Sequence, residues 1–121
     1  MGHISIDARF KGSRWVKVRA LIDTGATYCL LPPGIARRAG LDPQRRTYRV
    51  RLANGNTVRV GGDIGTVRID GREAPATVLI GKADEPIIGV EVLEALGVSL
   101  DMKKGRLRHT RGYAVRLGGY R

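Results

Sequence analysis

The stretch Ala20 to Pro32, ALIDTGATYCLLP, places one carboxylate, Asp23, inside a run that otherwise has the composition of a protein core. Burying a lone carboxylate in apolar surroundings is unfavourable in free energy unless its charge is paired, hydrogen-bonded or neutralised. One interpretation of Asp23 is a helix cap or an Asx turn that closes a strand. Another is a carboxylate that faces a second carboxylate and shares a proton with it. Such a pair supplies a general base and a general acid at one place.

The sequence around this stretch predicts a mostly β domain. Apolar and polar residues alternate over His3–Arg9 and Trp15–Ile22, and the turn Lys11–Arg14 would join these two strands in a hairpin. Glycine-bounded runs predict further strands, and 3.6-residue apolar spacing with a following glycine predicts short helices. These further strands are Gly65–Asp70, Ala76–Ile80 and Val98–Met102, and the helices are Ile35–Ala39 and Val90–Leu96.

A second hairpin is predicted over residues 47–60, where Asn54-Gly55 separates two alternating runs. A two-residue loop would place Val50 opposite an arginine. A three-residue loop with Gly55 in the left-handed conformation places Val50 opposite Val58 instead. We prefer the second register because it sorts apolar from charged side chains.

Length, charge and cysteine content limit the possible classes of protein. The 121 residues suffice for one domain, and we expect a core over about 3–102 and a basic extension over 103–121. The net charge of +11 is compatible with nucleic acid, but no recognised binding motif accompanies it. We therefore do not favour a nucleic-acid partner, and a basic nucleic-acid-binding β domain is kept as an alternative.

The cellular compartment is predicted from the cysteine content and from the lack of membrane-spanning and signal-peptide patterns. Cys29 is the single cysteine, so no intrachain disulfide can form. No apolar stretch is long enough to span a bilayer, and the first residues lack a signal-peptide pattern. These features predict a cytoplasmic protein without membrane association. The two histidines are far apart in sequence, so we expect no metal site and no cofactor.

Two short motifs resemble those of a known family. The segment Ala20–Thr27 (ALIDTGAT) resembles the active-site signature of the retropepsins, the retroviral-type aspartic proteases. Ile87-Ile88-Gly89, just before the expected C-terminal helix, is similar to their second signature, and the hairpin over 48–60 occupies the place of their flap. The resemblance covers about Ile4 to Asp101 and is greatest to small single-domain bacterial or archaeal members. It implies a retropepsin-like acid-protease half-barrel with one short C-terminal helix and a flap hairpin.

The resemblance also implies a role for each matching residue. Asp23 would be the catalytic aspartate, and Thr24 would hold its loop to the facing loop through its hydroxyl. Gly25 and Ala26 would complete the active-site loop. The second signature would support that loop, and the flap would close over substrate. The second signature consists of Ile87, Ile88 and Gly89. The flap residues expected to contact substrate are Val50, Leu52, Ala53, Asn54 and Gly55.

Asp-Thr-Gly occurs once in the chain, although the catalytic pair needs two carboxylates. The resemblance therefore implies a homodimer that hydrolyses peptide bonds with one Asp23 from each subunit. In the family, terminal strands interleave at the dimer interface, and Ile4–Ala8 and Tyr113–Leu117 are the candidates here. The alternative is a non-catalytic peptide-binding or dimerisation domain of the same fold.

Side chains next to these motifs lead to three further expectations. Ala26 cannot donate the side-chain hydrogen bond that Ser or Thr supplies in some aspartic proteases, so we expect activity to extend toward mildly acidic or near-neutral pH. Cys29 is expected to be a small core residue. The arginine face of the second hairpin (Arg49, Arg51 and Arg59) is expected to be solvated, but beside a substrate cleft it would favour acidic side chains.

Overall fold

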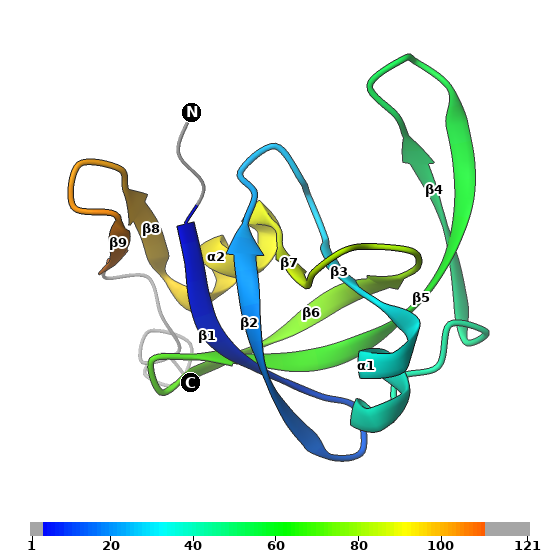
Figure 1. Ribbon diagram of the computed structural model, residues 1–121, viewed down its shortest axis with the longest axis horizontal. Helices are drawn as coiled ribbons and strands as arrows, with labels where there is room; N and C mark the ends of the chain where they lie inside the picture. The colour runs from blue at the N-terminus through cyan, green and yellow to red at the C-terminus, as the bar shows by residue number, and fades with distance from the viewer. Residues whose placement is uncertain (1–3, 111–121) are drawn as a thin grey trace, which may run out of the picture.

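Seven strands form one sheet that closes on itself in the computed structural model, which describes residues 4–110 (Figure 1). The strand order is β1-β2-β7-β3-β6-β5-β4, and β1 also pairs with β5. Six strands therefore make a ring, and β4 is attached to β5 outside it. The strands are β1 (Ile4–Lys11), β2 (Trp15–Ile22), β3 (Cys29–Leu31), β4 (Arg46–Arg51), β5 (Thr57–Ile69), β6 (Arg72–Ile80) and β7 (Ile87–Ile88).

The remaining elements are two short helices and a separate two-stranded sheet. Helix α1 (Pro33–Ala39) follows β3, and helix α2 (Val90–Leu96) follows β7. Strands β8 (Val98–Asp101) and β9 (Arg106–His109) pair with each other, so the described beginning of the basic extension belongs to a hairpin. The prediction of a mostly β fold is confirmed. The expected strand Tyr113–Leu117 lies outside the described residues.

The first hairpin forms as its alternation predicts. Strands β1 and β2 pair along their full lengths, from Ile4 opposite Ile22 to Lys11 opposite Trp15. The side chains that point into the ring are fully apolar and buried, and they include Ala8, Phe10, Val18, Ala20 and Ile22. Apolar burial of this kind is the main force that holds such a small barrel together.

No helix within residues 4–110 is long and apolar enough to cross a membrane.

Strand β5 is longer than the sequence suggested. It runs without a break through Gly61-Gly62, which lie between the predicted hairpin that ends at residue 60 and the predicted strand that begins at Gly65. A Cβ on Gly61 would lie 2.5 Å from the Pro43 carbonyl oxygen, and one on Gly62 would lie 2.6 Å from that of Val78. These glycines therefore allow neighbouring backbone to approach closely and do not end the strand.

The second hairpin has the predicted register. Arg49 lies opposite Arg59 and Val50 opposite Val58, with Gly55 in the left-handed region at φ 89°. We call the hairpin formed by β4, residues 52–56 and the first part of β5 the flap. It projects to the same side of the molecule as the loop between β2 and β3, at the top of Figure 1.

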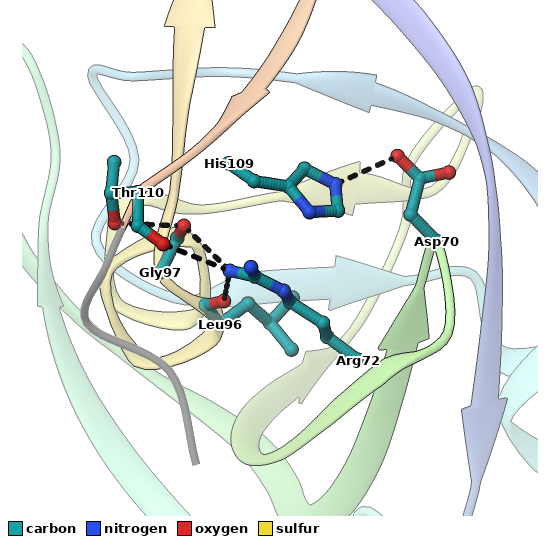
Figure 2. A network of polar contacts seen from close by, with 6 residues as sticks. All are labelled: Asp70, Arg72, Leu96, Gly97, His109 and Thr110. Carbon is teal, nitrogen blue, oxygen red and sulfur yellow. Dashed lines mark hydrogen bonds and ion pairs between the residues drawn. The ribbon is translucent and has the colours of Figure 1, made fainter. Parts of the chain in front are cut away.

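Polar contacts fasten the β8–β9 hairpin to the barrel (Figure 2). The guanidinium of Arg72, at the start of β6, donates hydrogen bonds to the carbonyl oxygens of Leu96 (3.0 Å) and Gly97 (2.9 Å). These carbonyls belong to the C-terminal end of α2, where a cation is favourable. His109 on β9 lies 3.2 Å from the carboxylate of Asp70 in the β5–β6 turn. The start of β6 thus holds α2 through Arg72, and the β5–β6 turn holds β9 through Asp70.

Candidate active site

Asp23 lies directly after β2, on the loop that leads to β3. Its backbone N–H donates to the carbonyl oxygen of Ile88 at 3.0 Å. Its side-chain Oδ1 accepts a 2.9 Å hydrogen bond from the backbone N–H of Gly25, which forms an Asx turn. The side chain is half-buried. The turn therefore orients the carboxylate and leaves part of it accessible to solvent.

The loop that carries Asp23 is held by the first turn of α2. The backbone N–H of Val90 donates to the carbonyl oxygen of Ala26 at 2.8 Å, and that of Glu91 donates to Thr27 at 3.0 Å. The first N–H groups of a helix have no partner within the helix, so these loop carbonyls satisfy them. The residue at the N-cap of α2 is Gly89, which has no side chain that could accept these hydrogen bonds instead. Helix α2 and the Asp23 loop thus stabilise each other through backbone atoms.

Strand β7 brings the two sequence motifs together. It pairs in parallel with β2, with Leu21 opposite Ile87 and Ile22 opposite Ile88, and it meets β3 at Leu30. Ile88 is fully buried, whereas Ile87 is half-buried. The segment Ile87–Gly89 therefore lies against the Asp23 loop, at the place where the resemblance puts it.

A cavity of about 530 Å³ opens beside Asp23. Asp23 is the one acidic residue that lines it among residues 4–110, and two arginines of β4 contribute positive charge. The remaining lining is mostly apolar or aromatic, as expected for a site that accepts an organic ligand. The full lining is Asp23, Gly25, Ala26, Thr27, Tyr28, Leu30, Arg49, Val50, Arg51, Leu79 and Ile87.

Several residues assigned a role from the sequence do not line this cavity. Thr24 is exposed, and Ile88 and Gly89 pack behind the loop. The flap tip, Leu52–Gly55, does not line the cavity either, and of the flap residues assigned to substrate only Val50 does so. Their roles stay predictions, because a flap acts on substrate only when it closes.

Other lining residues were not found by the sequence reasoning. The most notable is Tyr28, whose ring lies 5.9 Å from the ring of Tyr48 at the base of the flap. A signal for it was available in the alternation of residues 28–31, since Cys29 and Leu31 are buried and the alternate residues, Tyr28 and Leu30, must point to the opposite face. Tyr28 connects the Asp23 loop to the flap.

A larger hollow of about 700 Å³ lies between β1 and the β8–β9 hairpin, away from Asp23. Its carboxylates are already engaged. Asp7 pairs with Arg19, Asp70 pairs with His109, and Asp101 accepts a hydrogen bond from the backbone of Lys104. Within residues 4–110, no group of three or more His, Cys, Asp or Glu residues is placed to hold a metal ion. The cavity beside Asp23 is therefore the better candidate for chemistry.

Cys29 follows the Asp23 loop on β3 and is buried. Burial raises the pKa of the Cys29 thiol from 9.0 to about 11; a hydrogen bond from the backbone of Gly89 opposes this rise, and the charge of Glu91 adds to it. A thiolate is the nucleophilic form, so this side chain is unsuited to nucleophilic catalysis at neutral pH. Its expected place in the core is confirmed by its burial.

We expect Cys29 to resist alkylation in the folded protein. A pKa of about 11 in place of 9.0 lowers the thiolate fraction at pH 8 about 100-fold, and burial excludes the reagent as well. Iodoacetamide labelling followed by mass spectrometry should be slow in buffer and complete in denaturant. Rapid stoichiometric labelling of the native protein would contradict this placement.

Comparisons with known proteins agree with this arrangement. Residues 6–95 match the family described as "gag-polyprotein putative aspartyl protease". Comparison with curated protein sequences gave no significant match. Among solved structures, a retropepsin-like aspartic protease from Rickettsia conorii is similar at 26% identity and TM-score 0.59, over 83% of this chain and 75% of that one.

Two further structures share the fold at lower identity. The retroviral protease-like domain of Ddi1 from Leishmania major is 20% identical with TM-score 0.61, over 92% of this chain and 90% of that one. EIAV protease in complex with the inhibitor HBY-793 is 20% identical with TM-score 0.62, over 83% and 93% of the two chains.

Proposed function

The chain belongs to the gag-polyprotein aspartyl protease family and has the retropepsin-like fold, and we propose that it is an aspartic endopeptidase whose catalytic residue is Asp23. The proposal rests mainly on the position of the Asp23 side chain. It is the one carboxylate at its cavity among the described residues, and its loop is held by the segment that matches the second signature.

We propose a homodimer as the active form, because one chain supplies half of the catalytic pair. Asp-Thr-Gly occurs once in the sequence, and the cavity of one chain holds one carboxylate among residues 4–110. A two-fold axis would place a second Asp23 opposite the first. Thr24 is exposed on the same loop, where its hydroxyl is available to a partner loop.

The proposed mechanism follows from two carboxylates that share one proton. Two such groups close together cannot both ionise, so one remains protonated. The ionised Asp23 takes a proton from a water molecule, which attacks the peptide carbonyl carbon. The protonated Asp23 of the other subunit donates its proton to the carbonyl oxygen, which gives a neutral gem-diol. The first Asp23 then passes the proton that it took from water to the amide nitrogen, and the C–N bond breaks. The products are an amine and a carboxylic acid, and a hydroxyl proton of the diol returns to the carboxylate pair. The pair in pepsin-like and retroviral enzymes is the well-known example of this arrangement.

In this proposal, the Asp23 loop positions the catalytic carboxylate and the flap positions the substrate. The Asx turn at Gly25 fixes the carboxylate, and a Cβ at Gly25 would lie 3.2 Å from Asp23 Oδ1, so glycine leaves the approach open. The flap, with its tip at Asn54-Gly55, would close over substrate and exclude water. Val50 lies on the flap and lines the cavity, which suits it to contact substrate.

The proposal is tested by peptide-library cleavage with purified protein between about pH 4 and pH 7, with mass-spectrometric detection of products. Cleavage that a pepstatin-type inhibitor blocks would support it. A dimer that forms but cleaves nothing would instead favour a non-catalytic peptide-binding or dimerisation domain.

A further inference from the structure

Two arginines of the flap share the cavity with Asp23. Arg49 and Arg51 both line it, together with Val50 between them. They are two residues apart on one strand, so their side chains leave β4 on the same face. Strand β4 is the last in the sheet order, and among the described residues its second edge is unpaired. A peptide in the cavity would therefore pass close to the strand that carries both arginines.

The positive charge of this pair is not balanced within the described chain. The ion pairs of residues 4–110 join Asp7, Asp63, Glu73 and Asp70 to other basic residues, namely Arg19, Arg45, Arg68 and His109. Arg49 and Arg51 are exposed and take part in none of these ion pairs. On the same face, Arg49 lies opposite Arg59 across the flap, so like charges face each other. An acidic ligand would relieve this repulsion.

We propose that Arg49 and Arg51 are specificity-determining residues that select peptides with Asp or Glu close to the scissile bond; the inference rests on the protease function proposed above. Arginine suits this task because its planar guanidinium can bind a carboxylate through two parallel hydrogen bonds. Closure of the flap would bring these groups toward substrate and remove water, which strengthens each pair. The substrate class is acidic peptides and acidic protein segments.

The test compares matched peptides that differ only in Glu or Gln at positions near the cleaved bond. Wild type should cleave the Glu peptides with about 5-fold or higher kcat/KM, and the difference should appear mainly in KM. Arg49→Glu and Arg51→Glu should each abolish the preference, and the double variant should favour the Gln peptides. Added salt should reduce the preference of the wild type.

Arg46→Glu is the matched control. Arg46 lies on the same strand, β4, is exposed and gives the same change in net charge, but it does not line the cavity. It lies opposite Gly62, so the new carboxylate faces no arginine across the hairpin. It should keep the wild-type ratio of Glu to Gln cleavage. Equal cleavage of both peptides by wild type would overturn the inference. An equal loss of preference in Arg46→Glu would do so too, because it would indicate general charge attraction and not selection in the cavity.

A binding experiment separates this inference from the proposed function. Fluorescein-labelled Glu and Gln peptides are titrated with Asp23→Asn protein, and anisotropy reports binding without turnover. Tighter binding of the Glu peptide that Arg49→Glu removes would support the inference even if no peptide were ever cleaved. Cleavage without any Glu preference would contradict the inference alone, and absence of all cleavage would count against the protease function alone.

Discussion

Replacing Asp23 with Asn is expected to abolish peptide cleavage and to leave the fold intact. A carboxamide cannot take a proton from water or share one with a second carboxylate, so kcat should fall about 1,000-fold or more. The Asn side-chain oxygen can still accept the hydrogen bond that Gly25 donates to Asp23 at 2.9 Å. Thermal unfolding should therefore change little, and initial rates on a cleaved library peptide measure the loss.

Asp84→Asn supplies the control for this substitution. It makes the same chemical change on an exposed residue that does not line the cavity, so its rate should equal that of the wild type. Cleavage by Asp23→Asn at the wild-type rate would show that a contaminant or another residue is responsible.

Gly89→Ala is expected to have the largest effect on stability. An added Cβ would lie 2.4 Å from the carbonyl oxygen of Tyr28 and 2.7 Å from that of Thr27. Both atoms are backbone, and the same loop accepts the hydrogen bonds from Val90 and Glu91, so it cannot move away without losing them. We expect the free energy of unfolding to fall by about 3 kcal/mol. Urea denaturation followed by circular dichroism measures the change.

Gly34→Ala is the matched control because it adds the same methyl group elsewhere. Gly34 lies in α1, and a Cβ there would meet nothing within 4 Å. Alanine favours helix, so this variant should be as stable as the wild type or about 0.5–1 kcal/mol more stable. If both variants had the same urea midpoint as the wild type, the close contact of Gly89 with the Asp23 loop would be wrong. Peptide cleavage by Gly89→Ala should also decrease, since the loop carries Asp23.

Local patterns in the sequence predicted much of the fold. The alternation in β1 and β2, the register of the flap around Gly55 and the end of α2 at Gly97 each depend on neighbours along the chain, and the structure confirms them. The fold family followed from two short motifs in the right order. These features are local, so one sequence contains enough information to predict them.

The features that the sequence did not reveal depend on contacts between distant segments. The pairing of β1 with β5 closes the ring, and nothing in the pattern of either strand specifies it. The predicted strands leave out Gly61 and Gly62, because the close approach of Pro43 and Val78 is visible only in three dimensions. Strand β7 is two residues long, too short for any periodicity.

The same reasoning explains which parts of the site were found. Asp23 and Ile87–Gly89 belong to motifs, whereas Tyr28 and Leu79 line the cavity only because β3 and β6 pair beside the Asp23 loop. The contribution of Arg49 and Arg51 to the cavity also depends on where the flap lies. The alternation of residues along β4 indicates that these two arginines share one face of the strand. It does not indicate which part of the molecule that face lies against.

The most direct test of the central claim is a subunit-mixing titration. Wild-type protein at constant concentration is equilibrated with increasing Asp23→Asn protein, with saturating substrate and serum albumin as the control for added protein. If each site needs Asp23 from two chains, hybrid dimers hold one carboxylate and are inactive. Activity should then fall to about half at equal concentrations and to about a tenth at tenfold excess of the variant. Activity that stays constant throughout would show that each chain carries a complete site, which would contradict the shared Asp23 pair.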